Sequence, residues 1–135
     1  MESSIIGYSR GDASAQTFQA VNPASGTEIE VNYAMASEDE VEDACQLANQ
    51  AALSISQFSG KRKAEFLATL ADSIDGIVED LVTTMTAETG LPEPRVRAET
   101  GRTTGQLRLF AKLVQNGDWV DARIDRAQPD RQPLP

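Results

Sequence analysis

The single cysteine of this chain, Cys45, is its one candidate for a thiol nucleophile. A cysteine reacts as its thiolate, which forms where positive charge lies nearby or where a base takes the proton. The helical neighbours of Cys45 are Glu42, Asp43 and Gln46, and the chain contains no histidine. The sequence therefore predicts a buried structural cysteine rather than a catalytic one. It also predicts no zinc site within this chain, because the usual ligand types are missing.

Two glycines four residues apart, Gly101 and Gly105, are candidates for a phosphate-binding loop. Such a loop follows a strand, whereas these glycines lie inside a helical pattern. Each glycine in a helix costs about 1 kcal/mol relative to alanine. That cost predicts that another backbone approaches the helix closely on this side, although tolerance on a solvated surface explains the pair as well. We predict no phosphate site in this run.

Acidic side chains are numerous, but none has the partner that general acid–base chemistry requires. One motif keeps a second function open, because Asp72-Ser73 within an acidic helical protein is similar to the attachment site of acyl carrier proteins. The carrier serine must be exposed at the start of a helix, whereas Ser73 follows a helical stripe that begins at Phe66. The alternative function is therefore a small acidic helical binding module with Ser73 as its attachment site.

The charge of the chain is acidic and uneven. Residues 1–90 carry four basic and fifteen acidic side chains, a net charge of −11, whereas residues 91–135 carry eight basic and six acidic ones, a net charge of +2. An acidic chain without a basic stripe is a poor ligand for nucleic acid or an anionic membrane, so neither is expected as a partner. A role in solubility alone explains this charge equally well.

Three absences favour a cytoplasmic protein. The sequence has no apolar run of about 18 residues that could span a membrane, and its start lacks the basic and apolar regions of a secretory signal. One cysteine cannot form a disulfide within the chain. The length of 135 residues limits the chain to one domain at most.

Residues 17–33 predict a β-hairpin. Two runs of alternating apolar residues, 17–21 and 27–33, flank the five-residue loop Asn22-Pro23-Ala24-Ser25-Gly26. Proline fixes φ for the turn, and Gly26 supplies a positive φ. We therefore expect an antiparallel pair of strands near the N-terminus.

Residues 37–116 predict helices separated by turn signals. Ser37 and Glu40 form a capping box for the first helix, and Ser59 caps the second. Gly90 is placed as the left-handed residue that ends the third. In the first helix, small residues recur at helical spacing and predict tight packing on a neighbouring element. They are Ala44, Cys45, Ala48, Ala51 and Ala52.

The longest helical pattern runs from Pro94 to Asn116 and ends before Gly117. Leu107, Phe110 and Val114 recur at helical spacing, and further leucines widen this stripe beyond what one helix can hide alone. Three prolines in the last seven residues exclude regular structure at the end. Residues 117–135 are therefore expected to form an extended connector.

The order of these landmarks resembles the N-terminal part of the NAD(P)-dependent aldehyde dehydrogenases. The resemblance rests on the Asn22–Gly26 turn, the capped helix start at 36–41, the helices over 66–81 and the Glu88-Thr89-Gly90 ending. It covers nearly the whole chain. Three further runs are similar to the branch of the family that acts on 2,5-dioxovalerate (α-ketoglutarate semialdehyde). These runs are residues 101–110, 118–124 and 129–135.

The resemblance implies that residues 1–135 form a partial N-terminal section of an α/β enzyme, and that this section is mainly helical with an N-terminal β-hairpin. The family oxidises an aldehyde to an acid with NAD or NADP, and the parent enzyme is expected to be a cytoplasmic homo-oligomer. A cysteine thiolate attacks the carbonyl, hydride passes to the nicotinamide, and a glutamate helps water to hydrolyse the thioester. No position of this chain matches those residues, so it is expected to be inactive alone and to bind no cofactor by itself.

The resemblance does suggest a wall of the substrate tunnel. In the family, the helix that corresponds to Pro94–Asn116 packs beside the substrate entrance, and an arginine suits the carboxylate of an acid semialdehyde. The alternative is that the phenylalanine is part of the core and that the arginines lie on the surface. The predicted tunnel residues are Arg102, Gln106, Arg108 and Phe110.

Overall fold

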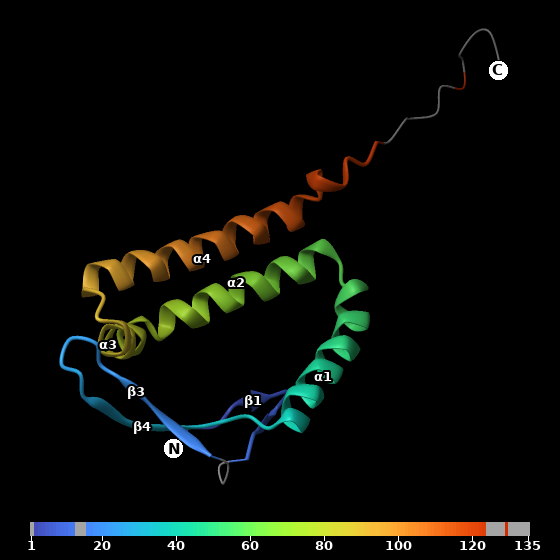
Figure 1. The fold of residues 1–135 in the computed structure, drawn as a ribbon. Coiled ribbons are helices and arrows are strands. Elements are labelled where there is room, and N and C mark those ends of the chain that lie inside the picture. The colour runs from blue at the N-terminus through green and yellow to red at the C-terminus, as the bar shows by residue number, and fades with distance from the viewer. Residues whose placement is uncertain (1, 13–15, 124–128, 130–135) are drawn as a thin grey trace.

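The computed structural model describes residues 2–12, 16–123 and 129, where two short β-hairpins precede four α-helices (Figure 1). The prediction of a mainly helical chain with an N-terminal β-hairpin is confirmed. The elements are β1 (Ile5–Ile6), β2 (Ser9–Arg10), β3 (Thr17–Val21), β4 (Glu28–Ala34), α1 (Glu38–Ser56), α2 (Gly60–Gly76), α3 (Val78–Thr89), α4 (Glu93–Asn116) and the 3-10 turn η1 (Asp118–Val120).

Strands β3 and β4 pair in antiparallel fashion, with Phe18 opposite Tyr33 and an irregularity between Gln19 and Val21. The side chain of Asn22 accepts a hydrogen bond from the backbone N–H of Ala24 at 2.9 Å. Gly26 has a φ of +72°, which favours glycine. The loop chemistry that the sequence predicted for this turn is therefore present.

Helix α1 begins with the predicted capping box. The side chain of Ser37 accepts from the N–H of Glu40 at 3.2 Å, and the carboxylate of Glu40 accepts from the N–H of Ser37 at 2.8 Å. The prediction that the small residues of α1 pack tightly is wrong, because α1 has no buried residue. The helix contacts β1, and its small residues are exposed in the described chain.

Helices α2 and α4 form the main packed pair of the structure, and they run antiparallel (Figure 1). Small side chains line the contact, so the two backbones lie close together. The two helices lie close together at the start of α2, because a Cβ on Gly60 would collide with the carbonyl oxygen of Val114. The buried residues of the two helices are Ala64, Ala71, Val96, Thr100, Thr104 and Ala111.

The close approach predicted at Gly101 and Gly105 is absent. Apart from the adjacent residues and backbone of α4 itself, nothing in the described chain lies within 4 Å of the place that a Cβ would take at either residue. Both glycines lie to the side of the stripe that contains Thr100 and Thr104, which faces α2. At Gly60, by contrast, an added Cβ would meet the backbone of Val114.

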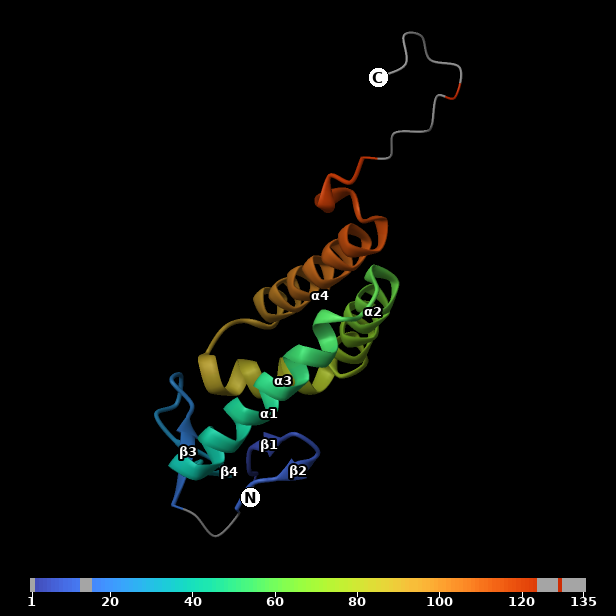
Figure 2. The same ribbon diagram turned by 90° about the vertical axis from the view of Figure 1, so that its right-hand side faces the viewer.

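Helix α3 runs crosswise to the α2–α4 pair, since it is seen along its axis in Figure 1 and from the side in Figure 2. It ends at Gly90, whose φ of +69° is the predicted left-handed cap. The hydroxyl of Tyr33 donates to Glu88 at 2.8 Å, and Pro23 lies against Gly90. These contacts hold the β3–β4 hairpin on the end of α3.

Helix α4 ends at Gly117, whose φ is +75°. The 3-10 turn η1 follows within the segment expected to be an extended connector, and much of that segment lies outside the described residues. None of the helices in the described ranges combines the length and apolar character that a membrane span requires.

Candidate functional site

Three of the four predicted tunnel residues come together on the surface of α4. Arg102, Gln106 and Phe110 are spaced by four residues, so they follow one side of the helix. With Thr103 and Leu107 they line a shallow pocket of about 300 Å³. Phe110 is 50% exposed, so within the described chain it is available to a ligand and is not part of the core.

The charge beside this pocket is positive. Arg102 contacts Glu99 at 2.9 Å, and Arg95 contacts the same carboxylate at 2.8 Å. The hydrogen bond from Arg102 lowers the pKa of Glu99, with smaller contributions from Arg95. Because two guanidinium groups share one carboxylate, this trio carries a net positive charge, which suits an incoming carboxylate.

Arg108 lies apart from the other three predicted tunnel residues. Its Nη2 donates to Asp72 at 2.6 Å and to Asp75 at 2.8 Å, and both carboxylates belong to α2. The hydrogen bond from Arg108 lowers the pKa of Asp75. In this arrangement Arg108 ties α4 to α2.

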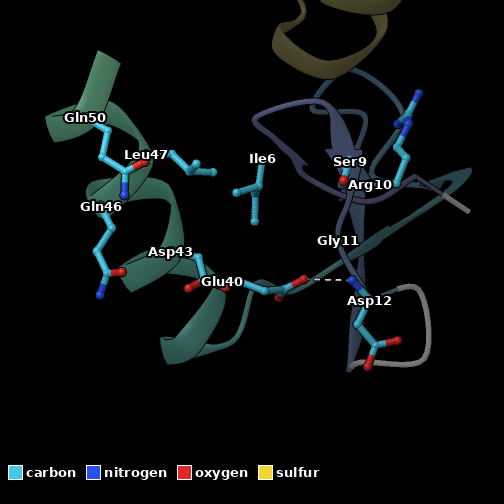
Figure 3. Close-up of a pocket in the computed structure, with 10 residues that line it drawn as sticks. All are labelled: Ile6, Ser9, Arg10, Gly11, Asp12, Glu40, Asp43, Gln46, Leu47 and Gln50. Atoms are coloured by element: carbon cyan, nitrogen blue, oxygen red, sulfur yellow. Dashed lines mark hydrogen bonds between the residues drawn. The ribbon is translucent and has the colours of Figure 1, made fainter. Parts of the chain in front are cut away.

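A second pocket, of about 420 Å³, lies between α1 and the β1–β2 hairpin (Figure 3). Leu47 points toward Ile6 across it, and Glu40 reaches toward the backbone N–H of Asp12 at 2.7 Å (Figure 3). The hydrogen bond from Ser37, followed by that from Asp12, lowers the pKa of Glu40. The carboxylate therefore stays ionised and joins two segments of the chain, which is a structural role rather than that of a general acid.

Cys45 is exposed, so the prediction of a buried cysteine is wrong. No residue of α1 is buried, so no described element covers the side of the helix that carries Cys45. Ser73 lies near the end of α2, and its hydroxyl donates to the carbonyl of Thr69 at 2.9 Å. A serine in that place lacks the position at a helix start that a carrier attachment site needs.

The glycine run from Gly101 to Gly105 does not suit a nucleotide phosphate. It lies in the interior of α4, where backbone N–H groups are hydrogen-bonded within the helix. The side chain of Thr104 is buried in the same run. These residues therefore do not fit the dinucleotide that the resemblance implies for the parent enzyme.

Comparison with known proteins identifies the family. The sequence profile of the Aldehyde dehydrogenase family matches residues 10–132. This chain belongs to the aldehyde dehydrogenase family. It is 41% identical over 131 residues to the alpha-ketoglutaric semialdehyde dehydrogenase of Acinetobacter baylyi, which is 97% of this chain and 25% of that enzyme.

Two further relatives are also named as dehydrogenases. The alpha-ketoglutaric semialdehyde dehydrogenase 2 of Azospirillum brasilense is 41% identical over 132 residues, again 97% of this chain and 25% of that enzyme. The 1-pyrroline-5-carboxylate dehydrogenase of Staphylococcus saprophyticus is 37% identical over 76 residues, 56% of this chain and 15% of that enzyme. The chain thus spans about a quarter of the length of the first two relatives.

Sequence reasoning missed the polar contacts that hold the elements together. Arg97 binds Glu79 through two hydrogen bonds of 2.8 Å and so joins α4 to α3. The contact between Tyr33 and Glu88 was not expected either. The sequence shows opposite charges on successive helices. Which of these charges pair depends on how α2, α3 and α4 are arranged in space, and a sequence pattern does not give that arrangement.

Proposed function

We propose that this chain is a section of an NAD(P)-dependent aldehyde dehydrogenase that oxidises a small acid semialdehyde, such as 2,5-dioxovalerate, to the dicarboxylic acid. The observation that carries the proposal is 41% identity over 97% of the chain to two relatives named for α-ketoglutaric semialdehyde. The catalytic cysteine and glutamate of the family have no counterpart here. The chain is therefore expected to have no activity by itself.

We assign the wall of the substrate entrance to the pocket lined by Arg102, Gln106 and Phe110. The positive trio around Glu99 supports this assignment, because a semialdehyde acid brings a carboxylate that can replace Glu99 as a partner of Arg102. Gln106 adds an amide for hydrogen bonding, and Phe110 adds an apolar side. The resemblance places Arg108 in the same wall. Its contacts with Asp72 and Asp75 support an indirect role, in which it holds α4 in position against α2.

The assembled enzyme is proposed to be a cytoplasmic homo-oligomer that uses NAD or NADP. The nucleotide would accept hydride from the substrate when bound. The resemblance implies that its binding residues lie outside the part of the family that this chain matches, and the glycine run in α4 does not fit a phosphate. The aldehyde is the expected small-molecule partner.

The proposal is tested by joining this chain to the part of the Acinetobacter relative that the match leaves out, by co-expression or fusion. Formation of reduced nucleotide is measured with 2,5-dioxovalerate and with a neutral aldehyde of similar length. Arg102→Met should raise the KM for the acid semialdehyde about ten-fold or more, because a charge-assisted contact is lost, and should leave the neutral aldehyde unchanged.

Arg108→Met serves as the comparison. Loss of the Arg108 side chain should destabilise the α2–α4 contact, so activity should fall equally with the acid semialdehyde and with the neutral aldehyde. An unchanged KM for the acid semialdehyde in both variants would contradict the tunnel assignment. Oxidation of the neutral aldehyde without any preference for the acid would contradict the proposed substrate class.

A further inference from the structure

Five side chains follow one side of α4, in line with the pocket assigned to the substrate entrance. Consecutive residues of a helix are about 100° apart around its axis, so positions separated by three, four or seven residues share a side. The set is Arg95, Glu99, Arg102, Gln106 and Phe110. The buried side chains of Thr100, Thr104 and Ala111 lie on the other side, which packs on α2. The charged residues therefore extend the pocket along α4.

Glu99 takes the place between two arginines that a bound carboxylate would take. One of its oxygens, Oε1, lies 2.8 Å from Nη2 of Arg95. The other, Oε2, accepts a hydrogen bond from Nε of Arg102 at 3.0 Å and lies 2.9 Å from Nη2 of the same guanidinium. The edge of Arg102 formed by these two N–H groups is one that binds carboxylates in proteins. That edge is occupied by Glu99.

The contacts of Glu99 are exchangeable because both arginines reach water. The side chains of Arg95 and Arg102 are 63% and 75% exposed. An ion pair with such exposure contributes little free energy, since water and salt screen its charges. Another carboxylate can therefore replace Glu99 beside Arg102 at a small cost.

The balance of charge around Glu99 is the reverse of that at two other arginines of α4. Each of those arginines contacts two carboxylates. They are Arg97, with Glu79 and Glu93, and Arg108, with Asp72 and Asp75. At Glu99, two guanidinium groups share one carboxylate. The surplus positive charge lies next to the pocket that Arg102 lines, so an anionic ligand is favoured there.

We infer that Glu99 is an internal competitor for the substrate, and that the carboxylate of an acid semialdehyde displaces it from Arg102 on binding. Glu99 holds the guanidinium in place before the substrate arrives and lowers the affinity for the substrate. An uncharged aldehyde cannot make this exchange, so Glu99 affects acid substrates alone. This inference rests on the proposed function, because it takes this side of α4 as the wall of the substrate entrance.

Glu99→Gln tests the inference, because it keeps the size of the side chain and removes its charge. The variant is measured in the enzyme that joins this chain to the unmatched part of the Acinetobacter relative. We expect the KM for 2,5-dioxovalerate to fall about two- to five-fold, because an exposed ion pair no longer competes. The kcat should stay unchanged, as should both constants for a neutral aldehyde of similar length. Arg102→Met should change the same KM in the opposite direction.

Glu93→Gln is the matched control. It removes the same charge from the same helix and takes one contact from a guanidinium, since Glu93 lies 2.7 Å from Arg97. Glu93 is on the opposite side of α4 from Arg102, so the KM for the acid semialdehyde should not change. An equal fall of this KM in both variants would show that the overall charge of α4 governs affinity, and it would overturn the inference.

A second measurement does not depend on catalysis. The Nε–H group of Arg102 donates to Glu99, so its NMR signal reports this contact in the chain itself. The probe is 2-oxoglutarate, the acid that forms when 2,5-dioxovalerate is oxidised, added at constant ionic strength. We expect the signal to shift, with half-saturation at a lower concentration in Glu99→Gln. A response no larger than that to chloride would overturn the inference.

The outcomes separate this inference from the proposed function. If the acid semialdehyde is oxidised and its KM in Glu99→Gln is unchanged or raised, Glu99 only orients Arg102, and the inference fails while the proposed function stands. If the acid semialdehyde is not oxidised but the Arg102 signal responds to 2-oxoglutarate as expected, the proposed function fails and the exchange at Arg102 stands.

Discussion

At the scale of single residues, the same amino acid has opposite roles at two places in this chain. Gly60 is required at the start of α2 because the carbonyl of Val114 occupies the space beside it. Gly101 lies inside α4 with open space around it. The difference comes from what surrounds each residue, so the two glycines respond differently to the same substitution.

Gly101→Ala should raise the free energy of unfolding of the isolated chain by about 1 kcal/mol, because alanine favours the helix and meets no neighbour. Gly60→Ala should lower it by about 1–3 kcal/mol, because the added methyl forces the helices apart. Urea unfolding followed by circular dichroism measures both. Stabilisation by Gly60→Ala would show that α2 and α4 do not approach as described.

A single hydroxyl links the β3–β4 hairpin to α3. The hydrogen bond to Glu88, followed by burial and the charges of Glu88 and Glu2, raises the pKa of Tyr33 above 10.0. The folded state therefore holds this proton more tightly than the unfolded state. The resulting stabilisation is present below pH 10 and is lost as pH rises through the higher folded pKa.

Tyr33→Phe removes both the contact and its titration. We expect the variant to be less stable than the parent at neutral pH, and the difference between them to shrink above pH 10. Thermal unfolding of the two proteins, compared at matched pH, measures this difference because the titration of the lysines is common to both. A difference that stays constant into the alkaline range would show that the hydroxyl does not donate to Glu88.

Sequence predicts well those contacts that are local in the chain. The capping box joins Ser37 and Glu40, only three positions apart, so its pattern is visible in the letters themselves. Tyr33 and Glu88 are 55 positions apart, and such a contact depends on how helices cross, which no short motif specifies. For the same reason the tunnel prediction placed Arg108 with Arg102, while the structure directs its guanidinium to α2.

At the scale of elements, the stability of α1 depends on polar contacts at its first turn more than on packing. A helix in a protein usually gains most of its stability from a buried face, and α1 has no buried residue. Its fixed points are the capping box and the hydrogen bond between Glu40 and Asp12. The small residues of α1 were predicted to pack on a neighbouring element because they recur at helical spacing. Such spacing shows that they share one side of the helix, but it does not show that another element covers that side.

Ser37→Ala should therefore destabilise α1 by about 1 kcal/mol, with little effect on the α2–α4 pair. Hydrogen exchange of individual amides is the measurement, and faster exchange confined to α1 is the expected result. Equal acceleration in α2 and α4 would contradict the view that α1 is held separately.

The same helix should respond to acid. Because backbone hydrogen bonds lower the pKa of Glu40 below 4.5, its stabilising contribution is present above pH 4.5 and is lost as pH falls through the lower folded pKa. Glu40→Gln removes the titrating group. The protection factors of the α1 amides, which are corrected for the intrinsic pH dependence of exchange, should then lose their dependence on acid pH. Persistence of that dependence in the variant would assign it to another carboxylate.

At the scale of the whole molecule, apolar surface outweighs buried core. The buried hydrophobic residues of the described chain are Ala64, Ala71, Val82, Val96 and Ala111, most of them small. Many larger apolar side chains are exposed. A monomer with this distribution is expected to be marginally stable or to associate.

We therefore predict that thermal unfolding of the isolated chain depends on its concentration, because association couples to folding. Sedimentation over a range of concentrations should show species larger than the monomer. A sharp, reversible transition that is independent of concentration would contradict this prediction and would imply that the exposed sides are stable in water.

The contiguity of α2, α3 and α4 has a consequence for synthesis of the protein. All three helices lie within residues 60–116, and they pack mainly on one another. Contacts between neighbours in sequence form quickly, so this unit can assemble as soon as Asn116 leaves the ribosome. The exposed apolar side chains of α2 and α4 would then face water, and exposed apolar surface on a nascent chain is what chaperones bind.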